Sequence, residues 1–259
     1  MAKIYTKVIL NSFKNYVCFQ QYARVHYKTH ASSIISFLFD QTYWNLPKPK
    51  LIISVTGGAK MNLKPRLKDR FSKGLVKVAT TTNALIVTGG TYNGCMKLVG
   101  EAFKNNALSI DLAQRIVLLG IANWGSVANN EKLIQLPNAN VDIPIEYDLV
   151  KPKKPKYVSA MLDPNHTHFL LVDDSTVKFG GEVEFRANFE SELANQYNIP
   201  LAVLVVGGGP RTIITIYESL LKGSPCVLLE GSGESADIIA FALKKYKELV
   251  KIKSNLGDE

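Results

Sequence analysis

The sequence predicts an α/β fold, a Rossmann-like three-layer sandwich with a mostly parallel sheet. Continuous apolar runs, such as residues 51–55 and 201–206, are typical of parallel strands that helices cover on both faces. Segments with the period of a helix alternate with these runs, as βαβ units require. Glycine-rich turns follow several runs directly, which predicts that they share the carboxyl-terminal edge of one sheet, where open α/β folds bind ligands.

Each element is predicted from its own local pattern. The helix after Gly58 carries apolar residues at three- and four-residue spacing from Leu67 to Val78, so one stripe packs while its basic residues face water. Thr29 is expected to cap the first helix, and a proline-containing segment at 46–49 to end it. The predicted core strands are residues 50–55, 84–88, 115–122, 168–172, 200–206 and 226–230, and the other predicted helices are residues 31–44, 94–105, 181–197, 212–221 and 235–251.

The chain of 259 residues is long enough for one large core with a small appendage. We expect residues 1–45 to form an N-terminal extension with a short strand at 17–26 and a packing helix, and residues 46–259 to form the Rossmann-like ligand-binding domain. A long irregular stretch at 128–161 contains the lysine–proline run 151–156, and loops of such length usually have a function or move.

Lysine and arginine outnumber aspartate and glutamate by 31 to 22, which gives a formal charge of +9 and favours anionic partners. Nucleic acid is not predicted as a partner, because the basic residues are scattered. The densest groups, at 151–156 and in the last helix, lack interleaved aromatic residues and are typical of a solvated linker and a solvated helix face.

Cysteine and histidine usage predicts a reduced, cytoplasmic protein without a metal or a cofactor. The three cysteines include no CxxC pair, and the four histidines lack zinc-like spacing. The first residues show no secretory signal, and no apolar run reaches the roughly 18 to 20 residues that a membrane helix needs. The sequence therefore predicts no membrane span in this chain.

The glycine turns lack the spacing of two common nucleotide motifs. Neither GxGxxG with its acidic ribose-binding residue nor GxxxxGK[ST] is present, which disfavours a nicotinamide dehydrogenase and a P-loop hydrolase. Anion binding by the helix amino termini after Gly90, Gly209 and Gly233 remains. The alternative is that these glycines only make tight strand-to-helix turns.

Two further groups of residues follow the fourth core strand. Asp173 and Asp174 could hold a metal ion or a ribose hydroxyl, although aspartate is also a common turn and capping residue. Phe179, Glu182 and Arg186 could place an aromatic plate and a guanidinium around a base, because Arg186 lies one turn after Glu182 on the same helix face. The alternative is a surface salt bridge beside a core phenylalanine.

Several segments carry a family resemblance. They are LIISVTGGAK at 51–60, KPRLK at 64–68, GLVKVA at 74–79, VTGG at 87–90 followed by MK at 96–97 and VGE at 99–101, HFLLVDD at 168–174, and GSG at 231–233 with AD at 236–237. Together they resemble the amino-terminal homology region of melastatin-type transient receptor potential cation channels, most of all the subtype gated by ADP-ribose. The resemblance covers residues from about 40 to about 245.

The resemblance implies that residues 46–259 form a nucleotide-ligand-binding domain that binds ADP-ribose or a related nucleotide and passes its occupancy to a channel pore. The adenine would lie beside Phe179 and Arg186. The partners implied are this nucleotide-derived small molecule and other channel segments or subunits, which form a tetramer in the family, since this chain has no pore of its own. The candidate ligand-binding residues are Gly57, Gly58, Gly89, Gly90, Thr91, Asn93, Trp124, Asp174, Phe179, Glu182, Arg186, Gly208, Gly209, Arg211, Thr212, Gly231, Ser232 and Gly233.

Some positions depart from the family pattern. Phe179 stands where the ADP-ribose-gated channel has tyrosine, which keeps stacking and loses a hydroxyl. Glu234 stands where an arginine near the phosphates is expected, and it reverses a charge beside an anionic ligand. Arg211 replaces a glycine and could compensate by reaching the phosphates itself.

Two other functions stay open at this point. The wider superfamily includes the lonely-guy phosphoribohydrolases, but Thr215 stands where their catalytic glutamate is expected, so the sequence predicts no enzyme activity. A nucleotide N-ribosidase would need Glu218 or Asp174 as a substitute acid. A purely structural channel-assembly domain is the other alternative, and the charge reversal at Glu234 favours it.

Overall fold

The computed structural model describes residues 3–10, 19–61, 63–106, 116–134, 145–147 and 159–256. The predicted lysine–proline linker at 151–156 lies outside the described residues, as does Cys18. The start of the predicted strand at 115–122 also lies outside them, and its described part forms a strand at Leu118–Asn123.

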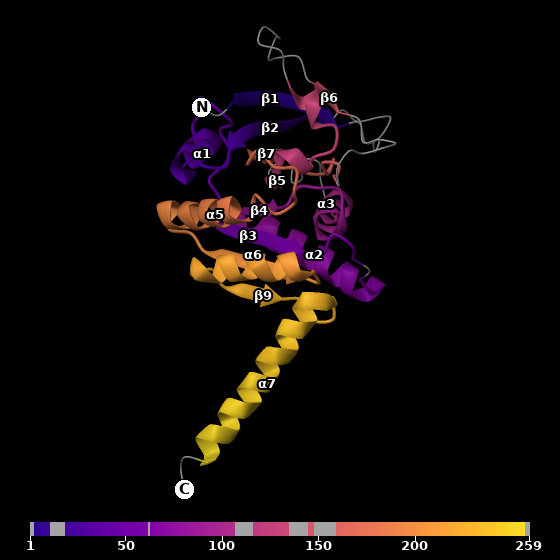
Figure 1. The fold of residues 1–259 in the computed structure, drawn as a ribbon, viewed down its shortest axis with the longest axis vertical. Helices are drawn as coiled ribbons and strands as arrows, with labels where there is room; N and C mark the ends of the chain where they lie inside the picture. The colour runs from indigo at the N-terminus through magenta and orange to yellow at the C-terminus, as the bar shows by residue number, and fades with distance from the viewer. Residues whose placement is uncertain are drawn as a thin grey trace.

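In the described part of the chain, one nine-stranded sheet has the strand order β6-β1-β2-β7-β5-β4-β3-β8-β9 (Figure 1). The run from β2 to β9 in this order is entirely parallel, whereas β1 is antiparallel to β2. This confirms the predicted α/β, Rossmann-like architecture. The strands are β1 Lys3–Leu10, β2 Phe19–His26, β3 Leu51–Gly57, β4 Ala84–Thr88, β5 Leu118–Asn123, β6 Ile145–Tyr147, β7 His168–Asp173, β8 Leu201–Val206 and β9 Cys226–Leu228.

The chain order of the parallel strands creates a switch point between β3 and β8. After β3 the chain adds β4, β5 and β7 on one side, and it then returns to place β8 and β9 on the other side of β3. Open α/β sheets bind ligands in the crevice at such a point, outside the carboxyl ends of the two neighbouring strands. The topology therefore singles out the ends of β3 and β8.

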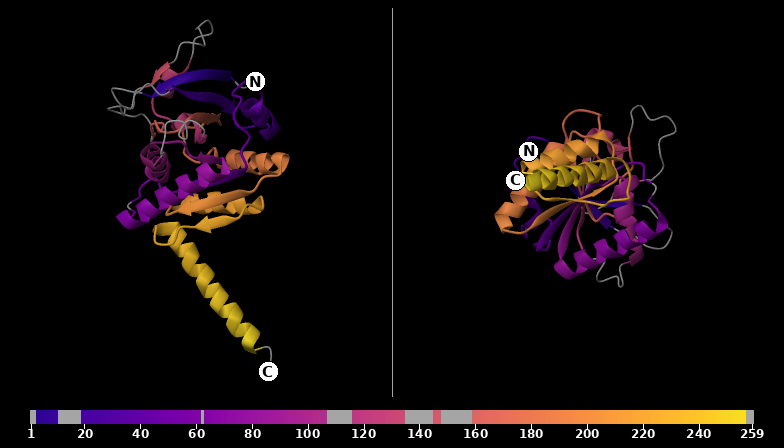
Figure 2. Two further views of the ribbon diagram at one scale, coloured as in Figure 1. Left: turned by 180° about the vertical axis from the view of Figure 1, so that it is seen from behind. Right: turned by 90° about the horizontal axis from the view of Figure 1, so that it is seen from below.

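Helices cover both faces of the sheet and complete the three predicted layers (Figures 1 and 2). α2 Pro65–Thr82 and α3 Gly94–Asn106 pack on one face. α1 Ala31–Phe39, α5 Val183–Tyr197 and α6 Pro210–Leu221 pack on the other. The side chains of β3 alternate accordingly, with Ile52 in the α1 and α5 cluster and Ile53 and Val55 in the α2 and α3 cluster.

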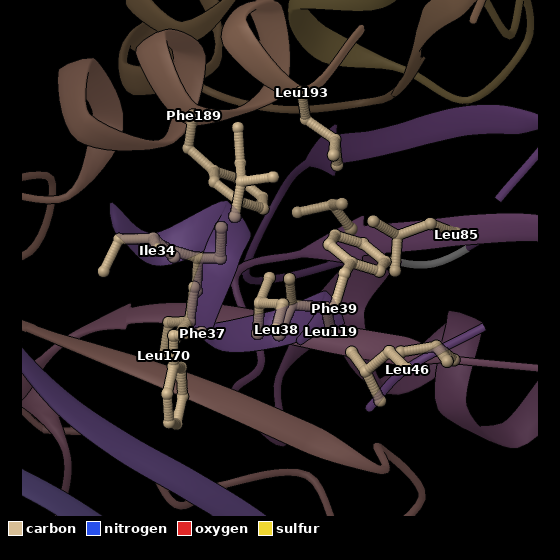
Figure 3. Close-up of a cluster of buried hydrophobic side chains, with 14 of the residues drawn as sticks. Ile34, Phe37, Leu38, Phe39, Leu46, Leu85, Leu119, Leu170, Phe189 and Leu193 are labelled. Atoms are coloured by element: carbon tan, nitrogen blue, oxygen red, sulfur yellow. The ribbon is translucent and has the colours of Figure 1, made fainter. Parts of the chain in front are cut away.

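The core on the α1 and α5 face holds α5 in place over the sheet (Figure 3). Leu38 of α1 and Phe189 and Leu193 of α5 are all 0% exposed in this cluster. Full burial of an apolar side chain of this size stabilises a fold by about 1.5 to 3 kcal/mol. The first turns of α5, which carry several candidate site residues, are therefore fixed relative to β3.

Residues 19–39 share the sheet and the core with the rest of the described chain. β2 pairs in parallel with β7, and α1 buries Ile35 and Leu38 in the cluster that α5 completes. The domain division at residue 45 stays a prediction. The extension also contains a strand that the sequence analysis does not predict, β1, which pairs with β2 and β6. The first helix ends at Phe39 rather than residue 44, and His30 rather than Thr29 is its N-cap.

A long C-terminal helix, α7 Glu234–Leu256, extends away from the sheet (Figures 1 and 2). Ala236 and Ala240 near its start are buried, whereas Phe241, Tyr246 and Leu249 are 64%, 66% and 59% exposed. Within the described ranges, every helix is too short or too polar to span a bilayer. The α6–α7 apolar surface, as we name it, comprises the exposed residues Ile213, Ile214, Tyr217, Leu220, Leu221, Val227, Ile238, Phe241, Leu243, Tyr246, Leu249 and Val250.

Candidate site at the switch point of the sheet

The turns after β3 and β8 lie side by side at the switch point. The N–H of Gly58 donates to the carbonyl oxygen of Val206 at 3.3 Å. A Cβ added at Gly58 would lie 3.3 Å from the backbone nitrogen of Gly208. The structure thus brings the predicted turn at 57–58 together with the predicted turn at 208–209.

Backbone packing alone explains several of the glycines. A Cβ on Gly57 would lie 2.0 Å from the carbonyl oxygen of Val206, and a Cβ on Gly94 would lie 1.8 Å from that of Gly58. Gly90 has a φ of +65°, and a Cβ there would lie 2.7 Å from the backbone of β5. No larger residue fits where two backbones approach this closely. The tight-turn alternative therefore accounts for these positions without a ligand.

Gly209 differs because a Cβ at this position would meet no atom within 4 Å. It is the N-cap of α6, and its carbonyl oxygen accepts the N–H of the buried Thr212 at 2.9 Å. The free N–H groups and the positive dipole end of a helix amino terminus favour anions. The start of α6 therefore offers an open approach for an anion next to the switch point.

Arg186 is buried beneath the ends of β3 and β4, with 7% of its surface exposed. Its Nε donates to Oε1 of Glu190 at 2.8 Å. Its Nη2 donates to Oγ of Ser54 at 2.7 Å and to the carbonyl oxygens of Val55 and Val87 at 3.2 and 3.0 Å. None of these bonds uses Nη1. The alternative of a surface salt bridge is wrong, because the ion pair is internal.

Phe179, Glu182 and Arg211 come together from two elements. Phe179 lies in the turn before α5, and Arg211 at the start of α6 places its Cζ 5.8 Å from the centre of the Phe179 ring. Glu182, the N-cap of α5, accepts the N–H of Gly180 at 3.1 Å. Burial raises the pKa of Glu182, and the positive charges of Arg186 and Arg211 oppose that rise. An aromatic ring, a guanidinium and a carboxyl group therefore lie beside the start of α6.

The paired aspartates after β7 are engaged within the protein. Oδ2 of Asp173 accepts the Nε of Arg24 at 3.0 Å. Oδ1 of Asp174 accepts the side-chain amide of Asn123 at 2.7 Å and the N–H of Thr176 at 2.9 Å. Among the described residues, no group of three or more His, Cys, Asp or Glu side chains is placed to hold a metal ion. Oδ1 of Asp173 likewise accepts the N–H of Ser175 at 3.0 Å, so the contacts of both aspartates support the turn-residue alternative.

Trp124 follows β5 and belongs to the buried apolar cluster beneath β7. It is 7% exposed, and the Cζ of Arg24 lies 4.2 Å from the centre of its ring. A ligand could reach this ring face only by displacing Arg24. The structure therefore gives no support to Trp124 as a ligand contact.

In the last predicted turn, residues 231–233, backbone N–H groups donate hydrogen bonds to a side chain of α7. The carboxylate of Asp237 accepts the N–H of Gly231 at 2.7 Å and that of Gly233 at 3.0 Å. Oγ of Ser232 accepts the N–H of Gly207 at 2.7 Å, which places this turn next to the β8 turn. An anion at these amides would have to displace the carboxylate, so the structure disfavours the predicted anion site after Gly233.

The turn after β4 has one buried and one open side. Gly90 and Thr91 are buried, whereas Gly89 and Asn93 are partly exposed. Asn93 lines a cavity of about 500 Å³ at the start of α3. Of the predicted residues in this turn, Gly89 and Asn93 are therefore the ones that a ligand can reach.

Three lysines in that cavity were missed by the sequence reasoning. Lys60, Lys68 and Lys97 line it together with Glu101. Lys68 and Lys97 pair with Glu101 at 3.1 and 3.7 Å, so Lys60 is the lysine without an ion pair among the described contacts. The i,i+4 spacing of Lys97 and Glu101 was the available signal, but it predicts only an ordinary helix-surface pair.

Comparison with known families decides what kind of domain this is. A family model described as "SLOG in TRPM" matches residues 20–259. The chain belongs to this family, the SLOG domains of TRPM channels. The predicted resemblance to melastatin-type channels is thereby confirmed.

Curated relatives of this SLOG domain are channel proteins. "Transient receptor potential cation channel subfamily M member-like 2" of Nematostella vectensis is 41% identical over 242 residues, which cover 89% of this chain and 15% of the relative. Subfamily M member 2 of Rattus norvegicus is 42% identical over 231 residues, covering 85% and 15%. Subfamily M member 7 of the same organism is 37% identical over 239 residues, covering 88% and 12%. The chain thus spans 12% to 15% of the length of these relatives.

The structure also places the two substituted positions noted in the sequence, Thr215 against the phosphoribohydrolase motif and Glu234 against the channel-domain pattern. Thr215 is a helical residue of α6, and its hydroxyl donates to the carbonyl oxygen of Arg211 at 3.1 Å. Glu234 begins α7, is exposed, and has a φ of +48°, a conformation that favours glycine. The SLOG domain therefore has no carboxylate at position 215 and has an acidic side chain at the edge of the last turn.

Proposed function

We propose that this SLOG domain is a nucleotide sensor that binds ADP-ribose or a related nucleotide at the switch point between β3 and β8. The observation that carries the proposal is the meeting of Phe179 from the α5 side with Arg211 from α6 beside the open Gly209. An aromatic ring and a guanidinium are the groups that hold a purine base and an adjacent phosphate. Binding would stabilise the contact between α5 and α6.

Charge supports an anionic ligand at this place. Arg211 is exposed at the start of α6, and Nη1 of Arg186 is not used by the contacts that hold its guanidinium. The amino terminus of α6 adds its dipole. Glu182 and Glu234 carry acidic side chains, and each ionised carboxylate would repel an anionic ligand that comes near it.

We propose that the sensor works on the cytosolic face of a channel assembly, because its curated relatives are named cation channels. Occupancy of its site would act on other segments or subunits, which would supply the pore. We do not propose a phosphoribohydrolase activity, because Thr215 cannot act as a general acid or base where that activity needs a carboxylate.

Isothermal titration of the chain with ADP-ribose, AMP and ATP tests this proposal. ADP-ribose is expected to bind with micromolar affinity, and Arg211→Ala is expected to weaken it about 10-fold, because one charge-assisted contact is lost. Lys222→Ala, an exposed basic residue at the opposite end of α6, is the matched control and should leave the affinity unchanged. Absence of heat with all three nucleotides would overturn the proposal.

A pH dependence follows from Glu182. Its pKa is raised above the ordinary value of 4.5 by burial, so lowering the pH from 7.5 neutralises it earlier than an exposed glutamate and removes a repulsion toward the anion. Nucleotide affinity should therefore rise as the pH falls, and Glu182→Gln should raise it about 3- to 10-fold at pH 7.5 and flatten this slope. Titrations at pH 7.5, 6.5 and 5.5 measure both effects, with the exposed Glu184→Gln as the matched control. Equal affinities and slopes for Glu182→Gln and the parent chain would contradict this account.

A structural assembly domain is the second candidate function, and the α6–α7 apolar surface favours it. Its large apolar side chains lie on one helix pair and the edge strand β9, with exposures between 46% and 66%. Apolar areas of this kind usually mark contacts with other protein segments. The same titration separates the two candidates, since an assembly domain without a sensor role gives no heat with any nucleotide.

A further inference from the structure

The buried turn at 163–166 binds the carbonyl oxygen of Gly90 directly and contacts, through His166, the Thr88 hydroxyl that binds the N–H of Gly90. The N–H of Gly90 donates to Oγ1 of Thr88 at 2.8 Å, and that oxygen lies 2.7 Å from Nε2 of His166. The carbonyl oxygen of Gly90 accepts the N–H of Asp163 at 2.9 Å. The N–H of His166 returns to the carbonyl oxygen of Asp163 at 3.2 Å. These residues form a closed ring of contacts around the turn after β4.

One tautomer of His166 lets the imidazole, the Thr88 hydroxyl and the Gly90 N–H form a chain of hydrogen bonds. Oδ1 of Asp163 lies 3.7 Å from Nδ1 of His166, and a carboxylate on this side favours a proton on Nδ1. Nε2 then accepts the hydroxyl proton of Thr88, whose oxygen in turn accepts the N–H of Gly90. Thr88 and Asp163 are 0% exposed and His166 is 1% exposed, so water cannot replace these bonds.

The ring contains polar atoms that remain unpaired. Oδ2 of Asp163 and Nδ1 of His166 are buried and have no hydrogen bond within the described part of the chain. Buried polar groups nearly always have partners, so such exceptions need a reason. A Cβ on Gly100 would lie 2.7 and 2.8 Å from the two carboxylate oxygens, so Asp163 is pressed directly against α3. The position of Asp163 is thus set by packing on the helix whose amino terminus borders the crevice.

The contact continues along the turn at 89–93. The N–H of Tyr92 donates to the carbonyl oxygen of Met161 at 2.7 Å, and Thr91 forms an antiparallel bridge with Leu162. We propose that residues 163–166 clamp the turn at 89–93 in the conformation that admits the nucleotide, and that His166 is a positioning residue that acts through Thr88. This inference rests on the proposed function, because the turn at 89–93 leads into Gly94, which packs against Gly58 at the switch point. His166 is 1% exposed, so its side chain is not open to direct contact with a ligand.

Four variants test the clamp. Thr88→Val keeps the shape of the side chain and removes the hydroxyl, His166→Phe keeps a ring and removes both nitrogens, and Thr88→Ser restores the hydroxyl. Thr80→Val is the matched control, because the Thr80 hydroxyl bonds only to carbonyl oxygens of its own helix α2. Each variant is titrated with ADP-ribose well below its own unfolding temperature, and the exchange rate of the Gly90 amide proton is followed by NMR without ligand.

The clamp predicts that Thr88→Val and His166→Phe weaken ADP-ribose binding about 10-fold and expose the Gly90 amide to faster exchange. Thr88→Ser and Thr80→Val should behave like the parent chain. If Thr88→Val folds and binds ADP-ribose as tightly as the parent chain, the inference is overturned. Free exchange of the Gly90 amide in the parent chain would also overturn it, and that measurement does not require any variant to fold. If the parent chain binds no nucleotide, the proposed function fails. The clamp would still be supported if the Gly90 amide exchanges slowly in the parent chain and fast in Thr88→Val.

Discussion

Arg186→Ala is expected to lower the free energy of unfolding by about 3 to 5 kcal/mol, because it leaves the carboxylate of Glu190 buried without its cation. Glu190 is 2% exposed, and its remaining partner is the hydroxyl of Ser54 at 2.7 Å. The substitution also removes the donor to the carbonyl oxygens of Val55 and Val87. Urea denaturation followed by circular dichroism measures the change.

Two controls separate this loss from an effect on the ligand. Arg211→Ala removes an exposed arginine from the same region and should change stability by less than about 0.5 kcal/mol. The double variant Arg186→Met with Glu190→Gln removes both buried charges and should recover a large part of the loss. A stability for Arg186→Ala within about 1 kcal/mol of the parent chain would contradict the internal ion pair.

Because Arg186→Ala is expected to destabilise the whole fold, a loss of nucleotide binding in this variant alone does not identify Arg186 as a ligand contact.

Gly94→Ala is expected to destabilise the protein by at least about 3 kcal/mol, or to prevent folding, because two backbones meet at this position. Gly94 has a φ of +46°, and a Cβ there would lie 1.8 Å from the carbonyl oxygen of Gly58. That oxygen accepts the N–H of Cys95 at 3.0 Å, so the clash would also separate α3 from the end of β3. Urea denaturation and the yield of folded protein measure the effect.

Gly74→Ala provides the matched control on the exposed side of α2. A Cβ at Gly74 would meet nothing within 4 Å, and the residue is helical. Replacement by alanine should therefore stabilise the helix by about 0.5 to 1 kcal/mol. If Gly94→Ala were as stable as the parent chain while Gly74→Ala gained stability, the close approach of the turns after β3 and β4 would be contradicted.

The parallel core could be predicted from the sequence because its central strands are short apolar runs that can be recognised from the local sequence alone. β3 is a continuous apolar run that ends at Gly57, and β8 is a similar run that ends before Gly207. β1 and β6 could not be predicted in this way. Residues 3–10 hold Lys3 and Lys7 among mostly apolar residues without a period of two, and β6 is only three residues long. The pairing of the two strands depends on contacts between distant segments.

The candidate site was predictable in its position but not in its internal contacts. Arg186 has a glutamate one turn before it and another one turn after it, and spacing does not distinguish them. The structure selects Glu190 because Ser54 and the ends of β3 and β4 lie on that side of α5. Likewise, Asp237 is visible in the sequence as an acidic residue near the turn at 231–233, but its contact with the amides of that turn depends on the turn's conformation, in which Gly231 and Gly233 have φ of +84° and +92°.

Amide chemical-shift mapping during titration with ADP-ribose tests the central claim most directly, because it locates the ligand on the fold. The account predicts that the largest shifts lie at Gly58, Gly209 and Arg211 and in the turn at 179–182, with small shifts at 231–233. A second cavity, of about 400 Å³, is lined by residues 27–31 at the end of β2 and by α5 residues including Asn188. Shifts concentrated around that cavity, with none at the switch point, would contradict the account.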